Sequence, residues 1–371
     1  MHADIVIIGG GLIGLAIAHR LAGDGADVCL IEAGQPGAGT TSAAAGMLCP
    51  GFELAHFAAE KQESFHRFAM ASLAGWREMA PALAEATGIH IDLRMSGALG
   101  LAANEKELAG FSTLAGRLSD FGRRPVMLSR DELDQLQPGL HERFRGALYL
   151  ADEGQVDPRL AATSMVAACE AMGVRIIGQT NVTGLDKEGD RVTAVTTGDG
   201  ERVAAGQVIA AAGLASRNFW LEPGPAPFFS IKGQALSLAA GAAGLACVIR
   251  TSGTYLCPKA DGRLVVGATE ERDIETLTTD EDRLDSLYEG AAAIAPGLKE
   301  CAVTGAWAGL RPTTPDRLPV IGRSLRVRNL IYAGGHHRNG ILLAPATARL
   351  VAAIAGGAGN PALTAPDRFA G

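Results

Sequence analysis

The sequence predicts an α/β protein of two domains, one built on a mainly parallel sheet and the other an inserted α+β domain with a mainly antiparallel sheet. A chain of 371 residues is too long for one small core and fits two domains. The order strand, glycine turn, helix occurs at the N-terminal end and again near the C-terminal end. Between these segments lie short β-branched runs separated by turn residues, a pattern typical of antiparallel meanders.

Composition excludes several classes of protein. Hydrophobic residues make up 47% of the chain and charged residues 20%, as in an ordinary globular protein. The net charge is −7, and no basic cluster is dense enough to follow the phosphates of a nucleic acid. No apolar run reaches the roughly 18 residues of a membrane span, and the first residues lack the basic segment of a signal peptide. We therefore expect no nucleic-acid or membrane partner and a cytoplasmic location.

The cysteines and histidines do not form a metal-binding pattern. None of the six cysteines belongs to a C-x-x-C pair, and no H-x-x-H spacing occurs. We expect no metal site, and we expect the cysteines to be reduced and mostly buried.

The N-terminal unit has the pattern strand, turn, helix, strand. Residues 4–8 predict a buried parallel strand, residues 12–22 a helix, and "DVCLIEA" (27–33) a second strand. Residues 54–86 then carry a helical pattern. The strand-like stretch 90–104 marks entry into a different unit.

The remaining elements follow in a similar way. Residues 105–136 have a helical pattern, a strand precedes Asp157, and a helix begins after that residue at Pro158. Residues 175–213 predict a meander of short strands that ends in the buried strand "QVIAAAG". Residues 228–238 and 254–269 predict further strands, and a helix follows residue 279. The tail, from residue 329, returns to strand, glycine turn and helix.

These elements predict how the two domains divide the chain. We assign residues 1–88, 150–225 and 305–371 to a discontinuous domain built on the mainly parallel sheet. Residues 89–149 and 226–304 then form the inserted domain.

Three glycines form the motif G-x-G-x-x-G between the first strand and the first helix. Gly9 permits a tight turn, Gly11 lets the backbone approach a pyrophosphate, and Gly14 lets the helix pack on the strand. The N-terminus of the helix offers free N–H groups to phosphates, and Glu32 ends the second strand, where an acid accepts ribose hydroxyls. The alternative is a glycine-rich turn without a ligand. Strand, helix and acid together favour a Rossmann-like domain that binds a dinucleotide.

The stretch "GTTSAAAGMLCP" (39–50) favours FAD over NAD. FAD is longer, and its ring system needs a bed further along the fold. The hydroxyls of Thr40, Thr41 and Ser42 are placed to donate to phosphate or ribitol oxygens, and the following small residues up to Gly46 let backbone run close to a flat ring. The alternative is a small-residue helix start packed in the core. Gly213, at the end of "VIAAAG", and the glycine-rich turn at Gly335 add small-residue segments beside the expected cofactor.

Several motifs together resemble the bacterial glycine oxidases of the D-amino-acid oxidase family, which are FAD-dependent. They are "GGGLIGLAIAHRLA", "TTSAAAGML", "GRLVVGAT", "WAGLRPTTPD", "LPVIG" and "GHHRNGILLAPATA", and the resemblance covers essentially the whole chain in order. It implies a Rossmann-like FAD-binding domain carrying the inserted substrate domain. The further cofactor contacts that it implies are Leu12, Ile13, Ala33, Ala45, Met47, Val182, His336, His337, Arg338, Asn339, Gly340, Ile341 and Leu342.

The resemblance also implies a substrate site. Arg311 pairs with the substrate carboxylate with help from Tyr255, and Arg338 and Met47 lie close to the substrate. The two arginines lie in apolar segments of the sequence, where burying an unpaired guanidinium would be costly. Their fork of donors is suited to binding a carboxylate. The alternatives are an internal salt bridge for either arginine and a plain strand aromatic for Tyr255. Lys259, where an arginine is more usual, and His337, where an aromatic is common, depart from the family pattern.

The implied reaction is oxidation of glycine or another small amino acid at Cα. Hydride passes to flavin N5 and no catalytic side chain is required, so the protein supplies orientation and desolvation. The imine is released or hydrolysed to the keto acid (glyoxylate from glycine) and ammonia, while O₂ becomes H₂O₂. The resemblance suggests a homo-oligomer that leans towards a tetramer, and a link to thiamine thiazole synthesis.

Two other functions stay open from the sequence. One is an FAD-dependent dehydrogenase of D-amino acids or N-substituted glycines such as sarcosine or iminodiacetate, with an acceptor other than oxygen. The other is a flavoprotein subunit of a larger complex.

Overall fold

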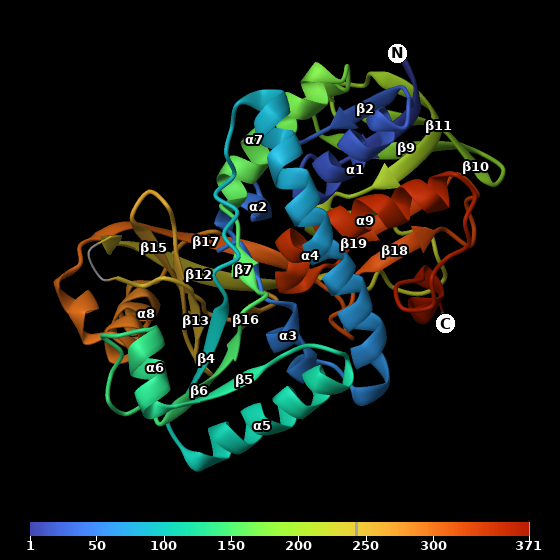
Figure 1. Ribbon diagram of the computed structural model, residues 1–371. Coiled ribbons are helices and arrows are strands. Elements are labelled where there is room, and N and C mark those ends of the chain that lie inside the picture. The colour runs from blue at the N-terminus through green and yellow to red at the C-terminus, as the bar shows by residue number, and fades with distance from the viewer. Residues whose placement is uncertain (242–243, 371) are drawn as a thin grey trace.

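The computed structural model describes residues 1–241 and 244–370, and its elements form two sheets (Figure 1). The first sheet has eight strands, with the path β18-β19-β11-β1-β2-β8 and with β9 and β10 attached beside β11. β1 (His2–Ile8), β2 (Val28–Ile31), β8 (Arg175–Ile177), β11 (Arg202–Ala210) and β19 (Leu330–Gly334) are paired in parallel. β18 (Val320–Arg323), β9 (Val182–Glu188) and β10 (Arg191–Thr197) are antiparallel additions.

Alternation along β1 explains why this sheet is buried on both faces. Ile5 and Ile7 belong to the cluster on the helix side, whereas Val6 and Ile8 belong to a cluster under the β9–β10 meander. The helices on the first side are α1 (Leu12–Gly23), α4 (Ala59–Thr87), α7 (Pro158–Ala171) and α9 (Gly340–Ala355), which pack against one another. The predicted strand–turn–helix–strand unit at the N-terminus is confirmed.

The second sheet has nine strands and is mainly antiparallel, as predicted. Its path is β16-β12-β15-β14-β13-β4-β6-β5, with β17 also paired to β12. The strands are β4 (Ala98–Ala102), β5 (Val126–Ser129), β6 (Gly146–Leu150), β12 (Phe229–Ala239), β13 (Val248–Arg250), β14 (Tyr255–Pro258), β15 (Arg263–Gly267), β16 (Glu271–Arg272) and β17 (Val303–Thr313). α5 (Glu105–Asp120), α6 (Arg130–Leu136) and α8 (Glu281–Ile294) lie on this side of the molecule (Figure 1).

Three sequence expectations differ from the structure. The helical stretch 105–136 is two helices with strand β5 between them, because residues 126–129 pair with β6. Of the strand-like stretch 90–104, only residues 98–102 form a strand. β17 begins at Val303 and belongs to the second sheet, although we assigned residues from 305 to the domain built on the mainly parallel sheet. Sheet membership therefore places the boundary predicted at residue 305 at the end of β17 instead. The other domain limits stay predictions.

The two sheets meet along a short connection. β3 (Met47–Leu48) and β7 (Gly154–Gln155) form a two-stranded ribbon, flanked by the short helices α2 (Thr40–Ala43) and α3 (Pro50–Glu53). The long helix α4 runs beside this boundary (Figure 1). Segments from both halves of the molecule thus converge on residues 40–53.

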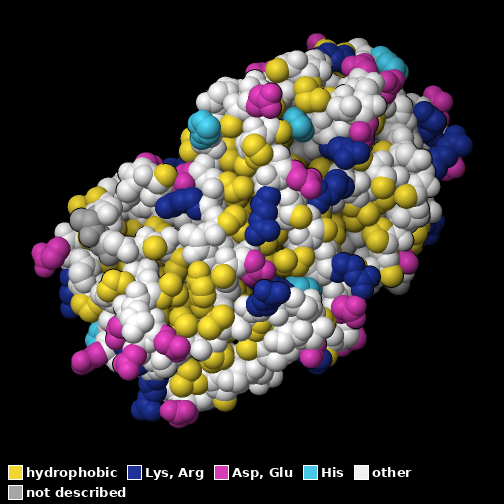
Figure 2. Space-filling view, viewed as in Figure 1, with side chains coloured by type: hydrophobic (Ala, Val, Ile, Leu, Met, Phe, Trp, Pro, Cys, Tyr) yellow, Lys and Arg dark blue, Asp and Glu magenta, His cyan; other side chains and the backbone are white. Residues whose placement is uncertain are grey.

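The charge distribution on the surface and the character of the helices concern two classes of partner, nucleic acids and membranes. On the face shown in Figure 2, basic and acidic side chains are interspersed and form no continuous basic band. In the described part of the chain, no helix combines the length and the apolar character needed to cross a bilayer. Five of the six cysteines are buried, Cys301 is half-buried, and all six are free thiols.

Candidate active site

A cavity of about 940 Å³ receives residues from both sheets. The turn after β1 and the ends of β11 and β19 line one part, and β13, β14, β17 and α5 line the other. Its volume is within the range of cofactor and small-molecule sites.

The glycine turn forms one end of this cavity. Gly9 has φ of +108°, and a Cβ there would lie 2.4 Å from the carbonyl oxygen of Ala211. A Cβ on Gly14 would lie 1.9 Å from the carbonyl oxygen of Gly9, so this glycine serves helix packing as predicted. Gly11 is the N-cap of α1 and has no side-chain cap. The Leu12 N–H donates to the Thr41 hydroxyl oxygen, and the first turn of α1 presents its other backbone N–H groups to the cavity, an arrangement that binds phosphate.

Glu32 is held rigidly beside this turn. Its Oε2 accepts from the Gly10 N–H at 2.6 Å and its Oε1 from the Gly34 N–H at 2.8 Å. Residues 178–180 close over this point, because the Thr180 N–H donates to the Glu32 carbonyl oxygen. The carboxylate lines the cavity at the end of β2, where a ribose is bound in Rossmann-like folds.

The bed at residues 40–47 differs in part from expectation. The Thr40 hydroxyl donates to the Leu310 carbonyl oxygen at 2.8 Å, and the Ser42 hydroxyl donates to the Ala38 carbonyl oxygen at 2.7 Å. These two hydroxyls are thus engaged within the protein, one by a carbonyl group of β17 and the other by a carbonyl group in the turn before α2. The Thr41 oxygen accepts from the Leu12 N–H at 2.9 Å, which ties the bed to the first turn of α1.

The backbone after α2 fits the expected close approach. Ala43 to Met47 line the cavity. Gly46 has φ of +81°, and a Cβ there would lie 2.0 Å from the Val156 carbonyl oxygen, so only glycine fits. The Trp307 indole N–H donates to the Ala43 carbonyl oxygen at 3.0 Å and holds the segment from the second sheet.

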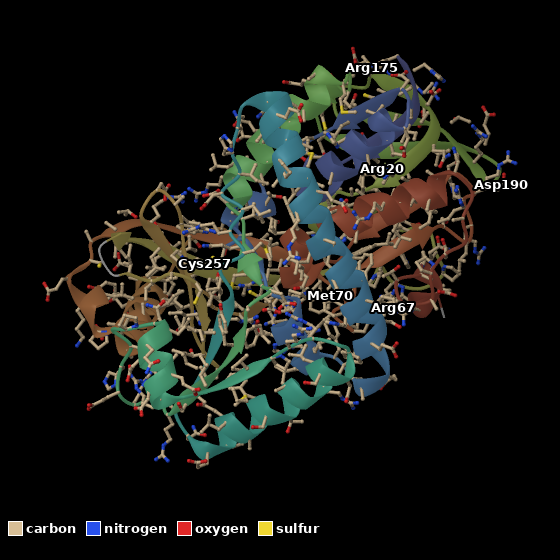
Figure 3. All side chains as sticks on the ribbon, viewed as in Figure 1. Arg20, Arg67, Met70, Arg175, Asp190 and Cys257 are labelled. Carbon is tan, nitrogen blue, oxygen red and sulfur yellow. The ribbon has the colours of Figure 1, made fainter. Side chains whose placement is uncertain are left out.

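Lys259 supports the same segment from behind. Its Nζ donates to the carbonyl oxygens of Ala45 (2.6 Å) and Val156 (3.0 Å) and to Oε1 of Gln155 (3.1 Å). The Cys257 thiol also donates to Gln155 Oε1 at 2.6 Å, and Figure 3 marks Cys257 on the second sheet, on its side towards the first. The lysine that departs from the family pattern is therefore a buried brace between the two halves of the protein.

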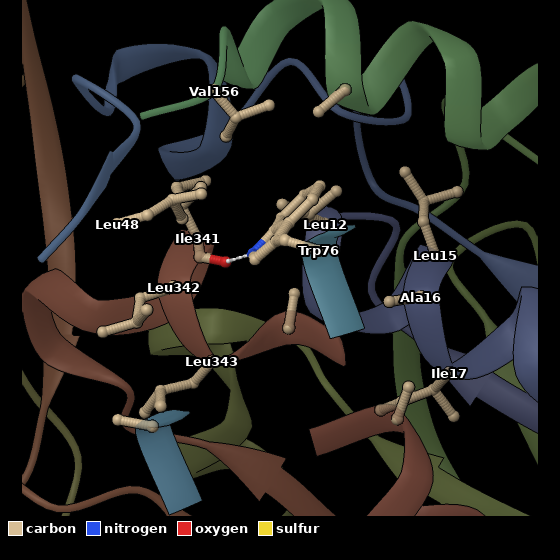
Figure 4. Packing of buried hydrophobic residues seen from close by; sticks show 14 of the residues in the cluster. Leu12, Leu15, Ala16, Ile17, Leu48, Trp76, Val156, Ile341, Leu342 and Leu343 are labelled. Atoms are coloured by element: carbon tan, nitrogen blue, oxygen red, sulfur yellow. Dashed lines mark hydrogen bonds between the residues drawn. The ribbon is translucent and has the colours of Figure 1, made fainter. Parts of the chain in front are cut away.

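The C-terminal glycine loop completes the wall. The Trp76 indole N–H donates to the Ile341 carbonyl oxygen at 2.9 Å, amid the core around α1 and α9 (Figure 4). His336 Nε2 lies 3.0 Å from the Thr347 hydroxyl. Burial lowers the pKa of His336 and that of His337 to about 3, so both imidazoles are neutral near pH 7. They therefore line the cavity as neutral side chains.

Most predicted site residues line this one cavity. They are Gly9, Gly11, Leu12, Ile13, Glu32, Thr40, Thr41, Ala45, Gly46, Met47, Gly213, Tyr255, Arg311, Gly335, His336, His337, Arg338, Asn339, Gly340 and Ile341. Gly14, Ala33, Ser42, Val182 and Leu342 do not line it. Leu342 packs in the core beneath α9 and Val182 in the core under the meander. Cofactor and substrate contacts stay predictions for all of the residues named in this paragraph.

Arg311 projects from β17 into the second part of the cavity. Its Nη1 donates to the carbonyl oxygens of Thr269 (3.1 Å) and Lys232 (3.5 Å). Within the described residues, no carboxylate lies in salt-bridge distance of it. Burial lowers the pKa of this guanidinium. A buried cation on a cavity wall, held only by carbonyl groups, is suited to bind an anionic ligand.

Tyr255 lies beside Arg311. Burial raises the pKa of the Tyr255 hydroxyl to about 12, against the opposing effect of Arg311 and Arg250. The hydroxyl is therefore protonated near pH 7 and able to donate a hydrogen bond to the same ligand.

Arg338 has features of both roles considered from the sequence, an internal salt bridge and ligand binding. Its Nε donates to Glu53 Oε2 at 2.7 Å, and its Nη1 lies 3.7 Å from Glu270. Its Nη2 is buried and has no partner within the described residues. Arg338 thus forms an internal ion pair and still offers one donor.

Three further residues line this part of the cavity and were not among the predicted site residues: Glu53, Arg250 and Glu270. Arg250 and Arg338 lower the pKa of Glu53 to about 2, against the effect of burial, so Glu53 is ionised. The signal was present in "CPGFELAHF", where a lone glutamate stands in apolar text, as Arg311 and Arg338 do. In the described residues, no cluster of histidine, cysteine and carboxylate side chains suits a metal ion.

Comparisons with known proteins agree with this site. The family model "FAD dependent oxidoreductase" (DAO) matches residues 4–354. The chain is 34% identical to glycine oxidase of Bacillus subtilis over 352 residues, which cover 94% of this chain and 92% of that protein. It is also 34% identical to the bifunctional protein ThiO/ThiG of a Nostoc species, covering 95% of this chain and 52% of that protein.

A solved structure shows the same fold. The crystal structure of glycine oxidase from Geobacillus kaustophilus superposes with a TM-score of 0.89 at 30% identity, covering 97% of this chain and 96% of that one. The cavity contains a guanidinium without a carboxylate partner among the described residues, and the family model matches nearly the whole length, so the chain belongs to the DAO family of FAD-dependent oxidoreductases.

Proposed function

We propose that this enzyme oxidises glycine or a similarly small amino acid at Cα, with O₂ as the electron acceptor. The observation that carries the proposal is Arg311, a buried guanidinium on the cavity wall without a carboxylate partner in the described residues. A substrate carboxylate would supply the missing counter-charge through a two-point contact.

The described residues fit FAD along the whole cavity. The first turn of α1 would hold the pyrophosphate and Glu32 the ribose, while the backbone of residues 43–47 would lie along the ring system. Met47 and the loop from Gly335 to Ile341 would flank the reactive end. When bound, FAD supplies the two-electron acceptor for the Cα–H hydride.

The protein's own contribution is orientation. Arg311 and the Tyr255 hydroxyl would fix the carboxylate, so that the Cα–H points at the cofactor. His336 and His337 are neutral, so they place no positive charge beside the amine. The products follow from the chemistry: an imine, which water converts to the keto acid and ammonia.

The test is anaerobic mixing of the purified yellow protein with glycine, sarcosine, D-alanine and D-proline. Loss of the flavin absorbance with at least one of them is the expected result. Bleaching by none would refute the proposed substrate class. Oxygen consumption with stoichiometric H₂O₂ then separates an oxidase from a dehydrogenase that uses another acceptor.

We further propose a cytoplasmic homo-oligomer whose imine product serves thiazole synthesis. Six free thiols support a reducing compartment, and the match to ThiO/ThiG supports the pathway. Light scattering and growth of a deletion strain without thiamine test these two points.

A further inference from the structure

A second arginine faces the substrate part of the cavity. Arg250, at the end of β13, lines the same cavity as Arg311, and its side chain is 16% exposed. Among the described residues it makes one hydrogen bond, from Nη1 to Glu53 Oε1 at 3.2 Å. Its guanidinium carbon lies 5.4 Å from the centre of the Phe52 ring. The remaining N–H groups of Arg250 are left to the cavity.

The local carboxylates do not satisfy all the guanidiniums. Glu53 is shared, because its Oε2 accepts from Arg338 while its Oε1 accepts from Arg250. Glu270 is half-exposed and lies nearest to Arg338. Within the described residues, these three arginines have only Glu53 and the half-exposed Glu270 in salt-bridge distance, because the nearby Glu271 is already paired with Arg283. Buried positive charge in this excess favours ligands with more than one acidic group.

The position of Arg250 suits a two-headed ligand. Arg250 is the cross-strand partner of Tyr255 in the pairing of β13 with β14, and Arg311 lines the same cavity as both residues. The cavity is also lined by Gly100, Leu101, Phe111 and Leu114 of the second half of the molecule. It therefore has room for more than a glycine molecule.

We propose that Arg250 binds a second acidic group of the substrate, so that the preferred substrates are small amino acids with two acidic groups. This inference rests on the function proposed above and names its substrate class. The second acid belongs either to an N-carboxymethyl substituent or to a side chain. With iminodiacetate the reaction balances as iminodiacetate, O₂ and water giving glyoxylate, glycine and H₂O₂. The hydride leaves one Cα, a C=N bond forms, and water cleaves that bond.

The first test uses the unaltered holoenzyme and needs no variant. Dicarboxylates (malonate, succinate) and monocarboxylates (acetate, propionate) are titrated against the flavin spectrum. We expect the dicarboxylates to bind at least 10-fold more tightly. Equal affinities would overturn the inference.

The second test compares kcat/KM for matched pairs, iminodiacetate against sarcosine and D-aspartate against D-alanine. We expect a preference for the diacid in at least one pair, and the pair that shows it tells where the second acid sits. Arg250→Met should lower this preference by about 30-fold or more, the loss expected when one partner of a buried charge pair is removed. Arg250→Lys should recover part of it.

A matched control is Arg317→Met, since Arg317 lines the same cavity but is exposed. Its charge is screened by solvent, so the preference should change by less than about 3-fold. Oxidation of the monoacids with no preference for diacids would refute the role of Arg250 and leave the proposed function standing. Bleaching by neither class would refute the proposed function itself.

Discussion

Replacing Arg311 by methionine separates a substrate-binding guanidinium from a structural one. Methionine keeps much of the side-chain volume but removes the charge and the donor fork. Truncating one partner of a buried charge pair costs about 2–5 kcal/mol of binding, which corresponds to a loss of about 30-fold to several thousand-fold in kcat/KM. Arg311→Lys keeps the charge but not the fork of donors, so its kcat/KM should fall between those of the parent protein and Arg311→Met.

The stability of the same variant should move little. Arg311→Met removes donors to the carbonyl oxygens of Thr269 and Lys232, a loss of about 1 kcal/mol. It also removes a buried cation that burial disfavours, as the lowered pKa of Arg311 indicates. The two effects oppose each other, so we expect the free energy of unfolding to change by no more than about 1 kcal/mol.

The assay is rapid anaerobic mixing with substrate, beside a measurement of FAD content and a thermal melt. A variant that keeps FAD and its melting temperature but loses bleaching at ordinary substrate concentrations agrees with the reasoning. Release of FAD or a large fall in melting temperature would show that Arg311 has a structural role instead of a substrate-binding one. Bleaching at the unaltered rate would show that the carboxylate binds elsewhere.

Three further predictions follow from contacts at the site. Glu32→Gln removes a charged acceptor from the backbone N–H groups of Gly10 and Gly34, and it should weaken FAD about 10- to 150-fold in a fluorescence titration; unaltered affinity would contradict the ribose role. Because folding lowers the pKa of His336 to about 3, only the unfolded chain takes up this proton as the pH falls below about 6.5. The free energy of unfolding should therefore drop by about 2 kcal/mol from pH 8 to pH 5 through this residue. In urea unfolding, the free energy of unfolding of His336→Gln should depend less on pH than that of the parent protein. An equal pH dependence in the two proteins would contradict this prediction. Trp76→Phe leaves the buried Ile341 carbonyl oxygen without its donor and should cost about 1–3 kcal/mol; a calorimetric melt unchanged from the parent protein would argue against that bond.

The sequence predicted those parts of the fold in which local pattern and turn signals agree. β1, the glycine turn and α1 are of this kind, since a buried apolar run precedes glycines at a fixed spacing. β5 was missed because the four residues "VMLS" alternate neither in polarity nor in burial. This strand exists through its pairing with β6, which no local pattern encodes.

The same distinction holds for the site. Gly9, Gly11 and Glu32 could be found because one supersecondary unit contains all of them. Glu53 and Arg250 are 197 positions apart and meet only because the fold brings α3 and β13 to the same cavity. The hydroxyls of Thr40 and Ser42 were assigned to the cofactor, but acceptors within the fold bind them first.

The brace formed by Lys259 has a consequence for how the molecule can open. Its ammonium reaches across the boundary to carbonyl oxygens at Ala45 and Val156, so a hinge motion that parts the two halves would strip it of acceptors. A buried charge without acceptors costs a large free energy. The two halves of the protein should therefore stay together at Ala45 and Val156 during any hinge motion.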